Sequence, residues 1–212
     1  MSKKILSLFS IIAAISMVVI ISCKHDSTPP IIDESTIPAG ICFSDDVLPL
    51  IQSNCAYSGC HSGSQNPNLS TYADIMKLVK AGDPQASRLY TTCIGSSMPP
   101  KPHSFLNLEE VTLIYGWIKQ GAPNNTCACD TSIYTYSGAV LPIIKRNCWG
   151  CHGTGSSKPY TNWQEISDAA YNIVQDITDS SGNPMPKPPT AKLSDCKITQ
   201  IAKWYNAGTP NN

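Results

Sequence analysis

The sequence predicts an all-α fold, rich in loops and built as two tandem copies of one unit. Three observations carry this prediction. The second half of the chain repeats the first in order and spacing, with small length changes in loops. Apolar residues recur at helical spacing, and no stretch alternates convincingly as a strand. The chain has 17 Pro and 13 Gly in 212 residues, so turns and loops must separate short helices.

The repeat is clearest at the two ends of each unit. The segment Val47–Cys55 (VLPLIQSNC) matches Val140–Cys148 (VLPIIKRNC), and the ending Ile114–Asn125 (IYGWIKQGAPNN) matches Ile201–Asn212 (IAKWYNAGTPNN). We therefore expect two domains, residues 41–127 and 128–212. Each is small but long enough for one hydrophobic core.

Both units predict the same series of helices. A Pro near its start marks a first helix at 47–52 and at 140–145. A second, short helix is expected over about 72–81 and 163–175, followed by a Pro-rich loop that carries a Met.

The last helix of each unit has recognisable ends. Asn107 and Ser194 are candidate N-caps, because their side chains can accept hydrogen bonds from the first free N–H groups. Gly121 and Gly208 suit the position just past a helix end.

Residues 1–22 predict an export signal. Two Lys precede a mainly apolar run, which ends at Ser22-Cys23 and resembles the lipobox of bacterial lipoproteins. We expect acylation of Cys23 and a Pro-rich tether over 23–40. The protein would then be exported and lipid-anchored on the periplasmic or cell-surface side of a bacterial membrane. The alternative is a permanent membrane helix, since the run is nearly long enough to span a bilayer.

Composition agrees with this location. Lys plus Arg and Asp plus Glu both number 15, so nothing suggests a nucleic-acid partner. Ten Cys are typical of an oxidising compartment rather than the cytosol.

The motif with the most specific chemistry is Cys148-Trp-Gly-Cys151-His152. This C-x-x-C-H pattern attaches c-type haem: two thiols form thioethers with the vinyl groups, and the adjacent His ligates the iron. The alternatives are a redox dithiol or half of a zinc site. Neither a thioredoxin-like context nor a second Cys/His pair at zinc spacing is present in the sequence.

The first unit carries the same device with two extra residues in its loop. Cys55 and Cys60 precede His61, and the repeat aligns this motif with that of the second unit. A Cys55–Cys60 disulfide is the alternative. The alignment favours haem here too, which gives two covalently bound haem c groups.

These features resemble cytochrome c: a helix, a haem motif, short helices, a Met-bearing loop and a last helix with an aromatic residue. The VLPII lead-in and the W-x-x-x-G-x-P-N-N ending are similar to planctomycete-type cytochrome c domains, over residues 41–212. The resemblance implies a cytochrome c-like domain around each haem. The first motif departs from the usual spacing.

Each unit also offers a sixth iron ligand. Met98 and Met185 both precede Pro and occupy the same place in the repeat, opposite the proximal His61 and His152. Both Met could instead be packing residues at the haem edge. His103, in the loop of Met98, is the competing ligand.

His/Met ligation fills both axial positions and leaves no open iron. The sequence therefore favours a membrane-anchored electron carrier over an enzyme, with an unidentified redox donor and acceptor as partners. The alternative is a peroxidase-like di-haem enzyme with one open haem iron.

Apart from Cys23, five Cys lie outside the haem motifs. Symmetry suggests a Cys42–Cys127 bridge around the first unit and a Cys129–Cys196 bridge in the second, which leaves Cys93 single.

Overall fold

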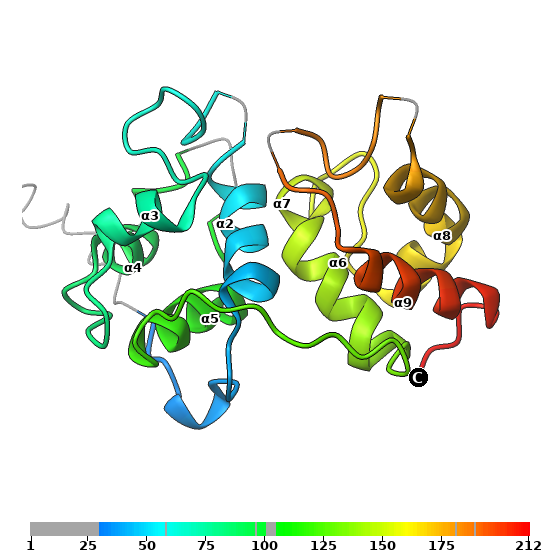
Figure 1. Ribbon diagram of the computed structural model, residues 1–212, viewed down its shortest axis with the longest axis horizontal. Coiled ribbons are helices and arrows are strands. Elements are labelled where there is room, and N and C mark those ends of the chain that lie inside the picture. Colours follow the sequence, from blue (N-terminus) through cyan, green and yellow to red (C-terminus); the bar gives the residue numbers. More distant parts are fainter. Residues whose placement is uncertain (1–29, 58, 96, 101–104, 181, 189) are drawn as a thin grey trace, which may run out of the picture. The chain divides into compact units, whose positions relative to one another are not determined.

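A computed structural model describes residues 30–57, 59–95, 97–100, 105–180, 182–188 and 190–212. Within these ranges the chain forms eight α-helices and no strand, so the all-α, loop-rich class is confirmed (Figure 1). None of the described helices has both the length and the apolar composition needed to cross a membrane. The predicted signal peptide and the lipidation site Cys23 lie outside the described residues.

Residues 31–212 form one compact unit. We call residues 41–127 the first repeat and 128–212 the second. A 3₁₀ turn at Glu34–Thr36 precedes the first repeat, whose helices are a π-helical turn Phe43–Val47, α2 Leu48–Asn54, α3 Tyr72–Ile75, a 3₁₀ turn Met76–Leu78, α4 Arg88–Ile94 and α5 Leu108–Lys119. Those of the second are a π-helical turn Tyr136–Val140, α6 Leu141–Asn147, α7 Trp149–His152, α8 Trp163–Thr178 and α9 Asp195–Asn206.

The last helices begin and end as the sequence predicts. Asn107 accepts a hydrogen bond from the Glu110 N–H, and the Glu110 carboxylate accepts one from the Asn107 N–H, a complete capping box. Ser194 caps α9 by accepting from the N–H of Lys197. Gly121 and Gly208 follow the two helices with φ of 92° and 85°, in the left-handed region that Gly adopts without strain.

The middle of each repeat differs from the prediction. The helix expected over 72–81 ends at Leu78 after one α and one 3₁₀ turn, whereas the one expected over 163–175 continues to Thr178. The loop expected before Met98 contains α4, which packs against α5 and buries Leu89 and Tyr90.

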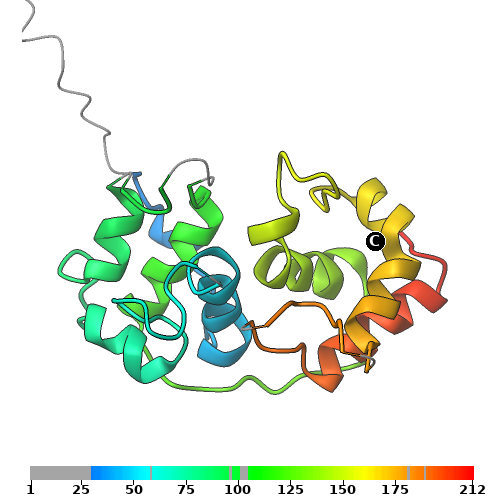
Figure 2. The same cartoon turned by 90° about the horizontal axis from the view of Figure 1, so that it is seen from above.

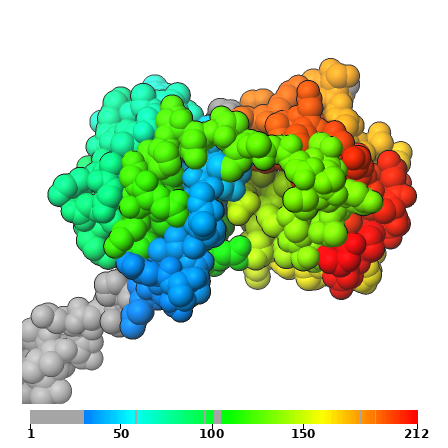
Figure 3. All heavy atoms as spheres, turned by 60° about the horizontal axis from the view of Figure 1, so that its bottom comes forward, coloured from blue at the N-terminus to red at the C-terminus, as the bar shows by residue number. Residues whose placement is uncertain are grey.

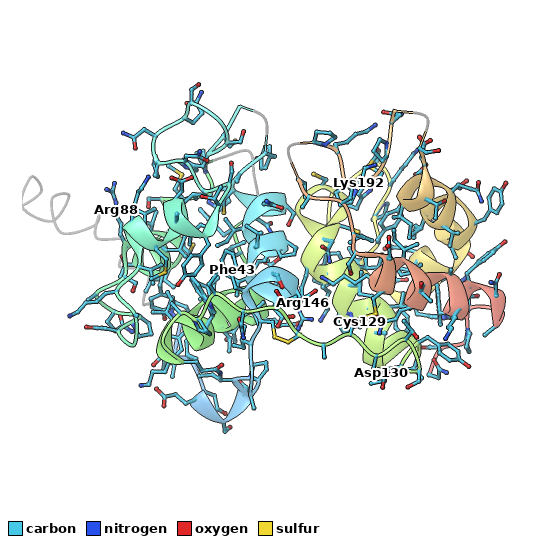
Figure 4. The ribbon with its side chains drawn as sticks, in the orientation of Figure 1. Phe43, Arg88, Cys129, Asp130, Arg146 and Lys192 are labelled. Atoms are coloured by element: carbon cyan, nitrogen blue, oxygen red, sulfur yellow. A yellow bond between two sulfur atoms is a disulfide. The ribbon has the colours of Figure 1, made fainter. Side chains whose placement is uncertain are left out.

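Buried apolar residues form two clusters, one in each repeat. The first lies between Ile41 and Ala122, and the second between Tyr136 and Trp204. Trp117 and Trp204 are fully buried at corresponding positions of the two clusters. Phe43, labelled in Figure 4, packs on Trp117 with ring centroids 5.4 Å apart. Because 31–212 form one compact unit, the domain boundary at 127/128 remains a prediction.

In each repeat a hydrogen bond joins the end of the chain segment to its first helical turn. In the first, the Asn125 side chain accepts from the Phe43 N–H at 2.9 Å. In the second, Asn212 accepts from the Tyr136 N–H at 2.8 Å. These long-range bonds give the repeated Pro-Asn-Asn ending a structural role.

Two disulfides join the Cys pairs that symmetry suggested. Cys42 is bonded to Cys127, and Cys129 to Cys196, with Cα atoms 5.7 and 6.2 Å apart, a separation that disulfides require. Cys93 is free.

The two repeats contact each other through α2, which packs against α6 and α7 (Figures 1 and 2). Arg146 forms an ion pair with Asp46 at 2.9 Å, and Lys197 forms one with Asp45 at 3.2 Å (Figure 4 labels Arg146). The space-filling view shows the blue-to-green chain of the first repeat meeting the yellow-green-to-red chain of the second (Figure 3). Motif residues of both repeats are therefore near this contact.

Candidate functional site

The second repeat brings its four predicted site residues to one cavity. Cys148 caps the end of α6, and Cys151 and His152 lie in α7. Met185 lies in the loop after α8, where its N–H donates to the carbonyl of Asp176 at 2.9 Å. The cavity has a volume of about 260 Å³ and is otherwise lined mainly by apolar or aromatic side chains, among them Tyr160, Ile173, Ile177, Pro186, Pro188 and Leu193.

The first repeat also brings its four predicted site residues to one cavity. Cys55 follows α2, and Cys60 and His61 follow in the loop. All three line a cavity of about 220 Å³ together with Met98. A smaller adjoining cavity of about 90 Å³ is also lined by Cys55, His61 and Met98.

Both His rings are oriented by a backbone carbonyl six residues further on. Nδ1 of His61 lies 2.9 Å from the carbonyl oxygen of Pro67, and Nδ1 of His152 lies 2.8 Å from that of Lys158. A carbonyl can only accept, so Nδ1 carries the proton in each ring. The lone pair is then on Nε2, which leaves that atom available as a metal ligand.

The backbone hydrogen bonds near each His also correspond between the two repeats. The His61 carbonyl accepts from the N–H of Leu69, and the His152 carbonyl accepts from the N–H of Tyr160, both at 2.8 Å. The ring of Tyr160 also stacks on His152 with centroids 4.5 Å apart. The motif loops thus have the same backbone frame despite their different lengths.

Two of the motif thiols, those of Cys55 and Cys148, lie in an environment that keeps them protonated. Burial raises the pKa of Cys148 to about 12. Burial, followed by the charges of Cys93 and Glu110, raises the pKa of Cys55. Reactive redox thiols and zinc ligands instead need stabilised thiolates. Within the described ranges no group of three or more His, Cys, Asp or Glu is placed to hold a metal ion.

Neither Met side chain is fully buried. Met98 is 38% exposed, and Met185 is partly exposed. His103, the competing ligand predicted for the first repeat, lies outside the described residues.

Two residues at the sites were not predicted to have a role there. Cys93 of α4 lines both cavities of the first repeat, and burial raises the pKa of its thiol to about 11. Tyr57 lies in the longer Cys55–Cys60 loop and lines cavities of both repeats. The extra length of that loop was the only signal in the sequence.

No known family model, curated protein or solved structure matches this chain.

Proposed function

We propose that the chain is a di-haem c-type cytochrome that carries electrons. The observation that carries the proposal is the recurrence of one donor set. In each repeat the two thiols and the His of one motif line a mainly apolar cavity together with a Met that is distant in sequence. Cys55 and Cys60 would attach one haem, and Cys148 and Cys151 the other. These residues fit the group in number, kind and position.

The chain's own residues orient the two His rings and offer a further ligand to each site. The carbonyls of Pro67 and Lys158 fix the His rings with Nε2 unprotonated. Met98 and Met185 offer a thioether to the same cavities. A haem iron with both axial positions filled exchanges single electrons without binding a substrate.

An enzyme with one open iron is the second candidate, and the exposure of Met98 favours it for the first repeat. A Met side chain that is 38% exposed is held only in part by packing contacts. If Met98 does not ligate, the first iron has a free position that could take peroxide.

The proposed setting is outside the cytoplasm, with lipid on Cys23 and a membrane as the anchoring surface. The electron donor and acceptor would be redox proteins. With 15 basic and 15 acidic residues, no nucleic-acid partner is proposed.

Optical spectra of the purified full chain, with and without carbon monoxide, test this function. We expect low-spin spectra in both oxidation states and no rapid binding of carbon monoxide. The matched variants Met98→Ala and Met185→Ala should each open one iron to carbon monoxide. A high-spin ferric signal with peroxide reduction in the native protein would favour the enzyme, and absence of haem would overturn both candidates.

A further inference from the structure

Tyr57 lies between the two candidate haem sites. It lines the first-repeat cavity that holds Cys60 and His61. It also lines the second-repeat cavity that holds Cys151 and His152. A third cavity, of about 310 Å³, lies where the repeats meet, and Tyr57 lines that one too.

The electrostatic surroundings of the phenol agree with this position. Burial raises the pKa of Tyr57 most, followed by a hydrogen bond and the charge of Cys60 and then by the charge of Cys151. Two cavities are lined by both Tyr57 and Cys151, and one is lined by both Tyr57 and Cys60. The side chain therefore shares a cavity with an attachment thiol of each repeat.

The close packing of the repeats brings the second site within reach of this side chain. Ser53 of α2 donates from Oγ to the carbonyl of Arg146 at 3.3 Å. Gly150, inside the C-x-x-C-H motif, packs so tightly that a Cβ there would overlap the backbone carbonyl of Ser53. The end of α2, just before the first motif, thus packs directly on the second motif at Gly150, where only Gly fits.

We infer that Tyr57, in the longer C-x₄-C-H loop, forms part of the wall of both haem sites. This inference rests on the proposed function. A bulky aromatic ring at this point excludes water from both cavities at once. Because solvent access sets the potential of a haem, one residue then tunes both irons.

The test is potentiometric titration of the full, haem-loaded chain. Leu106 lines only a first-repeat cavity and Leu193 only the second-repeat cavity, so Leu106→Ala and Leu193→Ala should each shift one midpoint potential and assign it to its site. Tyr57→Ala should lower both potentials, because water entering both cavities favours the ferric state. Tyr57→Phe keeps the ring and should leave both midpoint potentials close to those of the unmodified chain.

A Tyr57→Ala shift confined to the potential that Leu106→Ala moves, or no shift, would overturn the inference. If Tyr57→Ala does not accumulate, Tyr57→Leu replaces it with the same two outcomes. Absence of haem from the unmodified chain would be a failure of the proposed function instead, and the pyridine haemochrome spectrum distinguishes the two cases.

Discussion

The hydrogen bonds that close the first repeat recur in the second with almost the same lengths. The indole of Trp117 donates to the Pro123 carbonyl at 3.0 Å, and that of Trp204 donates to the Pro210 carbonyl at 2.8 Å. A residue with positive φ follows the Gly in each case, Ala122 or Thr209. The frame of each repeat is therefore fixed by its own last helix and ending.

The two sites within these frames are different. The first has a longer Cys55–Cys60 loop and the additional helix α4, which brings Cys93 to the cavity. The described part of the second repeat has α8 in this region instead, a helix of 16 residues.

The last helix and ending of a repeat can therefore stay the same while its site changes. The closing bonds involve buried Trp and backbone groups, so they constrain the chain whatever lines the cavity. The site residues sit on loops or, for Cys151 and His152, on the short helix α7, and changes of length are tolerated in loops.

The largest expected effect is removal of a buried Trp. Trp117→Ala and Trp204→Ala should each lower the free energy of unfolding by about 3–5 kcal/mol, because each leaves a cavity and an unpaired carbonyl. Urea unfolding measures the loss, with Trp117→Phe and Trp204→Phe as milder controls. If only one of the two Ala variants lost stability, the last helices would not have equivalent roles in the two repeats.

Removing either disulfide should cost about 2–5 kcal/mol. The bonds Cys42–Cys127 and Cys129–Cys196 span 85 and 67 residues, and loop entropy grows slowly with length, so the two double Ser variants should lose similar stability. Thermal unfolding compares them, after peptide mass spectrometry without reduction has verified the pairing. A Cys42–Cys93 peptide would contradict it.

Gly150→Ala should destabilise the chain by about 1–3 kcal/mol, because the new methyl group overlaps a backbone carbonyl that cannot turn aside. Gly116→Ala is the matched control, since the atoms nearest to its methyl group belong to the side chains of Ile37 and Ile41 rather than to backbone. Urea unfolding should show the smaller loss for Gly116. Equal losses would mean that the repeats are not packed tightly at Gly150.

The smallest expected effect concerns the ion pair of Asp45 with Lys197. Burial alone would raise the pKa of Asp45, but the hydrogen bond from Ser44 and the charge of Lys197 outweigh it, so the pKa lies below the ordinary value. The stabilisation is therefore complete above the unfolded-state pKa, about 3.9, and is lost as the pH falls through the lower folded-state pKa.

Asp45→Asn should accordingly cost about 0.2–1 kcal/mol at pH 7, and the difference from the unmodified chain should shrink below about pH 4. Unfolding curves at pH 7 and pH 3 measure this, with the exposed Asp168→Asn as control. A difference in stability that grows on acidification would contradict a lowered pKa for Asp45.

Local signals predicted much of the fold. The caps Asn107 and Ser194, and Gly121 and Gly208 after the last helices, lie where the sequence placed them. Helix α4 was missed because its seven residues lie in a Pro- and Gly-rich stretch, and its stability comes from packing Leu89 and Tyr90.

The site residues also include some that a local pattern predicts and some that it does not. Cys148, Cys151 and His152 form a contiguous motif, so their proximity follows from the sequence alone. Cys93 and Tyr57 reach the cavities through tertiary packing, of α4 onto α5 and of one repeat onto the other, which no local pattern encodes.

The most direct test of two haem sites is the intact mass of the purified chain, with a pyridine haemochrome count and mapping of the haem peptides. We predict two covalent haems per chain, one on the peptide with Cys55 and Cys60 and one on that with Cys148 and Cys151. A single haem, or a first motif recovered as free thiols or as a Cys55–Cys60 disulfide, would contradict the account.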